Sequence, residues 1–465
     1  MVFLPSSVRV ERRMYLAKNL THERQKETTK NRFLKINPVN AWLQEISNKG
    51  SSPIIRKISM WQDLRKVLVG NRNVQLLMLQ AVVTQLCFGM FMVFWQPYVI
   101  DLGASFTQLS FIQVVITVFS GVGALAWGRL ADRSGRKPAH VGAMACRFIS
   151  ILFALTSRDW TGFLGFGVFM GLSASWTQRN PVTITYISES VGEERMSTAL
   201  SLYVSAGTLI TVVAAPLGGV LAANEGYTLI FVSCLVGELV NSALAWLFMR
   251  ETLEAPQENA PSATSGLGGL LIPERELLPF YLVSTLTMVS WRIAFSNLNA
   301  ILVQDYSLTT VQLGIMVSAF SISYGLSQAP LGVVMERYSK KAFYMVSQLG
   351  FLAIALGYLL FPSFPTFIAV QIINGVAHSF GMPPFVTMVM ARTPREQRST
   401  VMGKLTTLPQ IFSVPAPLIG GYLYERFGFG LLLYVRIICM ILTVLIIFRY
   451  IKPDQEKAET PRSTD

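Results

Sequence analysis

Twelve long apolar segments constrain the fold of this chain more than any other feature. A helix of about 20 apolar residues crosses the hydrocarbon core of a bilayer, and in lipid its backbone groups must bond within the segment. We therefore predict an all-α polytopic membrane protein with twelve transmembrane helices. The predicted spans are about 73–100, 106–128, 138–157, 160–188, 197–222, 227–249, 278–303, 309–333, 341–361, 364–391, 399–423 and 428–449.

The composition argues against a soluble enzyme. Charged residues make up 14% of the 465-residue chain and hydrophobic residues 52%, whereas soluble domains carry about 25% charged residues. No Walker A, zinc-protease or nucleophile-elbow motif occurs in the sequence. The four cysteines lie in apolar runs and form no C-x-x-C pair. We expect no enzymatic activity, no cofactor and no metal.

The spans fall into two groups of six, separated by a longer polar segment. Residues 251–276 are rich in Pro, Gly, Ser and Ala, a composition typical of a linker. This organisation predicts a basic cytoplasmic tail at 1–72, a six-helix bundle at 73–250, a cytoplasmic linker at 251–276, a second bundle at 277–449 and a cytoplasmic tail at 450–465.

Basic residues predict the orientation. If the N-terminus is cytoplasmic, the short inner loops hold thirteen Lys and Arg and the outer loops only Arg158 and Arg426. We expect a multi-pass protein of the cell membrane with both termini inside. The tail 1–72 has fifteen Lys and Arg against five Asp and Glu, and supplies most of the net charge of +13. Attraction to anionic lipid accounts for such a tail beside a span, so no nucleic-acid partner is expected.

The two groups of spans are copies of one another. Loop 2–3 reads Gly128-Arg-Leu-Ala-Asp132-Arg133-Ser-Gly135-Arg136-Lys137, and a Gly, an acid, an Arg and two bases recur 204 residues later from Gly332 to Lys341. The pair Gly218-Gly219 recurs as Gly420-Gly421. Parallel six-span repeats are a transporter architecture, with the substrate path between them.

The segment GRLADRSGRK resembles the loop 2–3 signature of the major facilitator superfamily, and the degenerate copy in loop 8–9 fits the same family. The resemblance covers about residues 70–450 and implies a secondary transporter that works by alternating access, as a monomer. It also implies a conformational gate on the cytoplasmic side, in which an arginine pairs with the acid at the inner end of the fourth span. The gate residues are Gly128, Asp132, Arg133, Arg136, Lys137, Glu189, Glu336 and Arg337. For Arg136, Lys137, Lys340 and Lys341, plain positive-inside topology is an equal alternative.

Charged residues inside the spans are candidates for function because they are costly in a membrane. They are Arg147, Arg179, Glu238, Arg292 and Arg436. Glu238 is the predicted proton-coupling group, with a structural ion pair as the alternative.

Polar faces at helical spacing complete the predicted substrate site, although interhelical hydrogen bonding would produce the same pattern. The predicted substrate-binding residues are Gln80, Thr84, Arg147, Trp291, Arg292, Asn374 and His378.

The segments Ala215–Gly219 and Ala416–Gly421 resemble the G-P-x-x-G-G element of drug-efflux antiporters. Ala215 replaces the first glycine there, and the family's fourth-span arginine would fall at Gly167. We predict proton-coupled efflux of amphipathic or drug-like small molecules. The alternatives are a transporter of an organic anion or metabolite, with Arg292 and Arg147 as ligands, and a membrane sensor that does not transport.

Overall fold

The computed structural model describes residues 71–175, 180–191, 193–253, 273–335, 339–394 and 397–451. Most of the predicted tails and linker lie outside these residues, as do Arg179, Glu336 and Arg337. The described chain is helical and contains no strand. Nine of its helical segments are long and apolar enough to cross a membrane.

Helices occupy all twelve predicted segments. In the first half these are α4 (Arg72–Asp101), α5 (Phe106–Ser134), α6 (Arg136–Thr156), α7 (Gly162–Leu172), α8 (Pro181–Val191), α9 (Glu193–Asn224) and α10 (Thr228–Phe248). The second half begins with the 3-10 turn η1 (Arg275–Leu277). It continues with α12 (Leu278–Phe295), α13 (Leu298–Tyr306), α14 (Thr310–Met335), α15 (Lys340–Leu360), α16 (Phe364–Ala391), α17 (Arg398–Ser413) and α18 (Ala416–Tyr450). The predicted all-α fold of two six-helix repeats is confirmed.

Three predicted spans are interrupted in the structure. The fourth is divided into α7 and α8, and the seventh into α12 and α13, with the break at Ser296 and Asn297. The eleventh consists of α17 and the first part of α18. Gly428, at φ +74°, separates this part from the last span, because a positive φ is readily adopted only by glycine.

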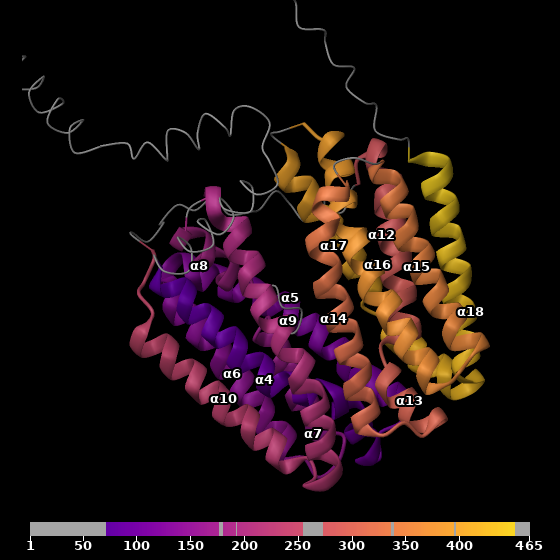
Figure 1. The fold of residues 1–465 in the computed structure, drawn as a ribbon. Coiled ribbons are helices and arrows are strands. Elements are labelled where there is room, and N and C mark those ends of the chain that lie inside the picture. The colour runs from indigo at the N-terminus through magenta and orange to yellow at the C-terminus, as the bar shows by residue number, and fades with distance from the viewer. Residues whose placement is uncertain are drawn as a thin grey trace, which may run out of the picture. The chain divides into compact units, whose positions relative to one another are not determined.

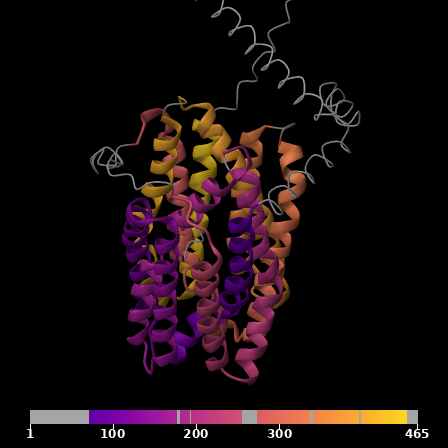
Figure 2. The ribbon, with the colours of Figure 1, turned by 90° about the vertical axis from the view of Figure 1, so that its left-hand side faces the viewer.

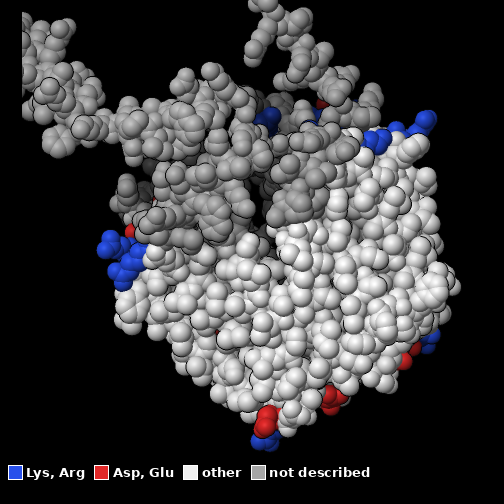
Figure 3. All heavy atoms as spheres, viewed as in Figure 1, with Lys and Arg blue, Asp and Glu red and all other residues white. Residues whose placement is uncertain are grey.

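The helices form two bundles (Figures 1 and 2). In the N-terminal bundle α4 packs on α9 and α10, and α7 on α5 and α6; in the C-terminal bundle α12 packs on α18, and α16 on α14 and α15. The bundles touch mainly through α9 with α14 and through α5 with α18. α8 and α17 lie at one end of the bundles, and α7 and α13 at the other. On the face drawn in Figure 3, the charged side chains gather toward the two ends, with an uncharged belt between them.

Candidate functional site

The bundles are joined by hydrogen bonds at the end of the molecule that contains the turns 102–105 and 307–309, here called the closed end. The break between α12 and α13 is held there by the N-terminal bundle. Gln96 Nε2 donates to the Ser296 carbonyl at 2.6 Å, and Gln113 Nε2 donates to Asn297 Oδ1 at 2.6 Å. Asn297 Nδ2 in turn donates to Ser110 Oγ at 2.6 Å. Uncharged side chains therefore hold the two bundles together across the break.

Two glycines bring the backbones of the bundles close together at the closed end. A Cβ added to Gly219 of α9 would lie 2.5 Å from the Thr310 carbonyl oxygen of α14. A Cβ added to Gly421 of α18 would lie 2.6 Å from the Phe106 carbonyl oxygen of α5. The two contacts are related by the internal repeat, and both need a residue without a side chain.

A cluster of charges lies at the opposite end of the N-terminal bundle. Arg136 Nη1 is 2.5 Å from Asp132 Oδ1, and Arg136 Nη2 is 2.9 Å from Glu189 Oε1. These three predicted gate residues are thus brought together by α5, α6 and α8. Lys137 lies over the Trp246 ring, with Nζ 5.6 Å from its centroid.

The remaining predicted gate residues make fewer contacts. Arg133 is exposed, and among the described residues no ion pair is recorded for it. A Cβ at Gly128 would meet no described atom within 4 Å. Close helix approach at Gly128 is therefore not a feature of this conformation.

Glu251 completes the charged cluster and could not be anticipated from the sequence, where it begins the expected linker. Its carboxylate accepts from the Arg136 N–H at 2.8 Å and the Lys137 N–H at 3.0 Å, and so caps the N-terminus of α6. Gly135, at φ +108°, leaves room for it. Partial burial raises the pKa of the Glu251 carboxyl, but hydrogen bonds from backbone N–H groups outweigh burial, and the pKa lies below its usual value.

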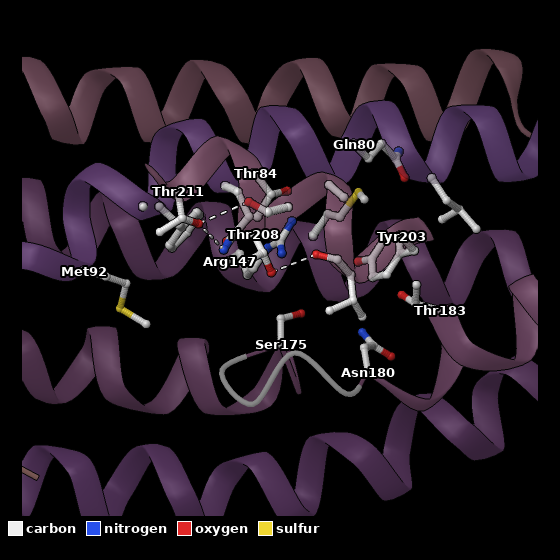
Figure 4. A pocket seen from close by; sticks show the side chains of 18 of the residues that line it. Gln80, Thr84, Met92, Arg147, Ser175, Asn180, Thr183, Tyr203, Thr208 and Thr211 are labelled. Atoms are coloured by element: carbon white, nitrogen blue, oxygen red, sulfur yellow. Dashed lines mark hydrogen bonds between the residues drawn. The ribbon is translucent and has the colours of Figure 1, made fainter. Parts of the chain in front are cut away.

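The N-terminal bundle contains a cavity of about 290 Å³ (Figure 4). Its lining comes from α4, α6, α7, α8 and α9, with Val317 contributed by α14. Thr84, Arg147 and Thr208 lie together, and Ser175 and Asn180 face them from the chain between α7 and α8. Apolar side chains, including Phe88, Met92 and Met170, line much of the remainder. Apolar walls with a few polar groups are typical of small-molecule sites.

One of the residues that line the cavity, Arg147, belongs to an ion pair. Arg147 Nη2 and Nε donate to Glu238 Oε2 at 2.8 and 3.1 Å. The guanidinium carbon lies 5.6 Å from the centroid of the Phe88 ring. Glu238 is 1% exposed and stands behind Arg147, which itself lines the cavity. The predicted proton-coupling residue and a predicted substrate-binding residue are therefore partners.

Gln80 and Thr84 have structural partners in the cavity wall. Gln80 Nε2 donates to the Asn241 carbonyl at 2.9 Å, and Asn241 Nδ2 donates to Thr84 Oγ1 at 2.9 Å. His140 Nε2 lies 3.1 Å from Gln80 Oε1. These are the interhelical hydrogen bonds of the alternative interpretation, made by residues that also line the cavity.

A second cavity, of about 180 Å³, lies in the C-terminal bundle toward the closed end. Trp291, Tyr358, Gln371 and Asn374 line it, and Gln96 of the N-terminal bundle joins them. The predicted substrate residues Trp291 and Asn374 thus meet here, apart from Gln80, Thr84 and Arg147.

Two predicted substrate residues line neither cavity. Arg292 Nη1 donates to Thr117 Oγ1 at 3.2 Å and so joins the two bundles. His378 is exposed on α16. Its ring lies 4.8 Å from the Phe351 ring and 5.8 Å from the Trp291 ring, measured between centroids.

Several lining residues were not singled out from the sequence, among them Ser175, Asn180, Thr183 and Tyr203. On α9 the lining residues Tyr203, Gly207 and Thr211 are four residues apart. This helical spacing is a sequence signal for one shared face of α9. It does not identify a cavity wall, because tyrosine and glycine are also common in packed helix interfaces. Ser175 and Asn180 belong to the interruption between α7 and α8, which hydropathy does not reveal.

The described helices form a polytopic membrane protein of two six-span repeats. The chain belongs to the major facilitator superfamily, whose family model matches residues 77–279 and again 280–465. It is 23% identical to rat solute carrier family 22 member 18 over 377 residues, or 78% of this chain and 89% of the relative. It is 24% identical to the multidrug resistance protein MdtL of Escherichia coli over 359 residues, or 75% and 87% of the two chains.

A solved structure shares the fold. The human organic anion transporter MFSD10 (TETRAN) superposes with a TM-score of 0.57 at 17% identity, covering 81% of this chain and 99% of that one. The chain is thus a multi-pass membrane transporter and not an enzyme.

Proposed function

We propose that this transporter exports amphipathic, drug-like compounds in exchange for protons, with Glu238 as the proton-carrying group. The observation that carries the proposal is the Arg147–Glu238 pair, whose arginine lines the 290 Å³ cavity. As long as Glu238 is ionised, the pair is neutral. A proton on Glu238 would leave Arg147 without a counter-charge and make the cavity positive, which disfavours an amphipathic cation. Protonation of Glu238 and binding of the compound in the cavity would then exclude one another, as exchange requires.

The multidrug resistance protein MdtL among the relatives supports an export function. The proposed orientation puts Gly135 and both termini in the cytoplasm, in the cell membrane. The contacts at the closed end would then block the outer side, and the cavity would be reached from the cytoplasm. Residues 73–250 and 277–449 are the proposed moving bundles of a monomer.

Proton exchange is tested in inverted membrane vesicles that are acidic inside. Adding ethidium or tetraphenylphosphonium is expected to collapse the pH gradient in vesicles with the wild-type protein. Glu238→Gln is expected to reduce this collapse at least about tenfold, because the amide carries no proton between the two sides. The gradient is followed by acridine orange fluorescence.

Arg449→Gln, an exposed change on α18, serves as the matched control, and protein levels are equalised by immunoblot. A Glu238→Gln protein that collapses the gradient as fast as the wild type would remove Glu238 from the proposed coupling. If neither compound collapses the gradient in the wild type, proton-coupled export of these cations is wrong.

Transport of an organic anion is the second candidate. The C-terminal bundle contains Arg436, a wholly buried arginine that is paired with no described carboxylate, and a superposable structure is named an organic anion transporter. Uptake of labelled benzoate into right-side-out vesicles would favour this candidate over drug export.

Arg136 is the proposed centre of a gate at the end opposite the closed end. Arg136→Gln is expected to lower the rate of export about tenfold, because Asp132 and Glu189 would repel one another without it. Arg136→Lys should recover part of the rate, since an ammonium cannot engage both carboxylates with a planar fork. Initial export rates at matched protein amounts measure the effect. Arg129→Gln, exposed on α5, is the control. Equal rates for Arg136→Gln and Arg129→Gln would support the topology interpretation.

A further inference from the structure

Arg436 on α18 has a vacant hydrogen-bonding edge inside the C-terminal bundle. Its side chain is 0% exposed. Nη1 donates to the Thr287 carbonyl at 2.7 Å and to Ser290 Oγ at 2.6 Å. Nε and Nη2 are buried and have no partner among the described residues. These two nitrogens form the side edge of the guanidinium, the edge that binds a carboxylate with two parallel N–H groups.

The N-terminal bundle shows the same edge occupied. There Nε and Nη2 of Arg147 donate to the Glu238 carboxylate, and the guanidinium lies over Phe88 of α4. In the C-terminal bundle the Arg436 guanidinium lies 5.4 Å from the ring of Trp291, on the first helix of that repeat, and 5.9 Å from the Phe351 ring. Phe351 stands at the repeat offset of 204 residues from Arg147. The second bundle thus also has a buried arginine beside aromatic rings, on a different helix from the one that carries Arg147 in the first bundle, but none of its described carboxylates pairs with that arginine.

A buried charge without a partner is costly, and an arginine edge of this geometry selects a planar oxyanion. We propose that Nε and Nη2 of Arg436 bind the carboxylate of an aromatic or amphipathic acid, in a site separate from the 290 Å³ cavity. If the transporter also carries this acid, that step rests on the second candidate function, organic anion transport. Binding of the acid at Arg436 needs no transport.

The neighbouring cavity of 180 Å³ offers a place for the rest of such an acid. Trp291 lines this cavity and also covers the Arg436 guanidinium. Tyr358 Oη and Asn374 Oδ1, from two other residues of its lining, are buried without a hydrogen-bond partner. Arg436 itself does not line this cavity, so the proposed binding requires the Trp291 ring to move aside; the aromatic body of the acid would then take its place beside Phe351 and His378.

Binding is measured on the purified full-length protein in detergent, by thermal unfolding with benzoate and with benzamide, its uncharged counterpart. Benzoate at about ten times its Kd is expected to raise the Tm of the wild type by about 2 °C, and benzamide to leave it unchanged. Arg436→Gln should abolish the benzoate shift, and Arg436→Lys should reduce it, because lysine lacks the two-nitrogen edge. Arg449→Gln, on the same helix, should keep the full shift.

Three results would overturn the proposal. The first is a wild-type protein that benzoate does not stabilise, a result that needs no variant to fold. The second is a benzoate shift lost in Arg292→Gln and kept in Arg436→Gln, which would place the carboxylate at Arg292. The third is an equal shift with sodium chloride, which would identify a site for any small anion. None of these outcomes depends on proton exchange in vesicles, so this site and the proposed export function fail independently.

Discussion

Replacing Arg147 with methionine is expected to destabilise the protein by about 3–5 kcal/mol, the cost of leaving a buried charge without its partner. Glu238, 1% exposed, receives both of its recorded hydrogen bonds from Arg147. Thermal unfolding can be followed with a thiol-reactive fluorophore, because Cys87 and Cys234 are free and buried in the folded bundle. The expected result is a large fall in Tm, with a smaller folded yield.

The double variant Arg147→Met/Glu238→Met is the decisive control for this expectation. Removing both charges should recover most of the lost stability, since two well-packed apolar side chains cost little where an ion pair stood. An Arg147→Met protein within about 1 kcal/mol of the wild type would show that the pair is not a main support of the N-terminal bundle.

Adding a methyl group at Gly219 or Gly421 is expected to open the closed end. The new Cβ would lie 2.5 Å from the Thr310 oxygen or 2.6 Å from the Phe106 oxygen, both in the opposite bundle. Since backbone cannot move aside locally, the bundles must separate there. We expect at least a tenfold rise in the labelling rate of Gln113→Cys by an impermeant maleimide. The reagent is added on the side that the proposed orientation makes the outside, in a background without the native cysteines. A tenfold rise in labelling rate corresponds to a shift of about 1.4 kcal/mol in the equilibrium between the closed and open conformations.

Other glycines provide matched controls for this opening. Gly121→Ala and Gly325→Ala place a methyl group where no described atom lies within 4 Å, and should leave labelling unchanged. Gly218 and Gly420 face Met90 and Ile293 within their own bundles, so alanine there should lower the folded yield instead. Unchanged labelling in both Gly219→Ala and Gly421→Ala would contradict the role assigned to these contacts.

The sequence predicted the helices well because hydropathy and length alone select membrane-spanning segments. It did not reveal the break at Ser296 and Asn297, whose freed backbone groups are satisfied by Gln96 and Gln113 of the other bundle. Such an arrangement depends on residues about 200 positions apart. The break at Gly428, by contrast, falls where the prediction separated the last two spans.

For the site, the sequence identified charges but not their partners. Arg147 and Glu238 were both conspicuous inside spans, yet only packing of α6 against α10 shows that they meet. The sequence places Glu251 in the linker, because its role as a cap depends on a helix that begins 115 residues earlier. Residues that act through distant contacts leave no local pattern in an amino-acid sequence.

The hydrogen bonds that hold the break between α12 and α13 differ from the contacts at the other end in how they respond to salt and membrane voltage. The side chains that make these hydrogen bonds carry no charge; they are Gln96, Gln113, Ser110 and Asn297. Ionic strength and membrane voltage therefore change the strength of these hydrogen bonds little. The Asp132–Arg136–Glu189 cluster at the other end is made of ions and is weakened by salt. In the proposed orientation, a rise in cytoplasmic salt is therefore expected to weaken the charged cluster more than the hydrogen bonds at the break between α12 and α13.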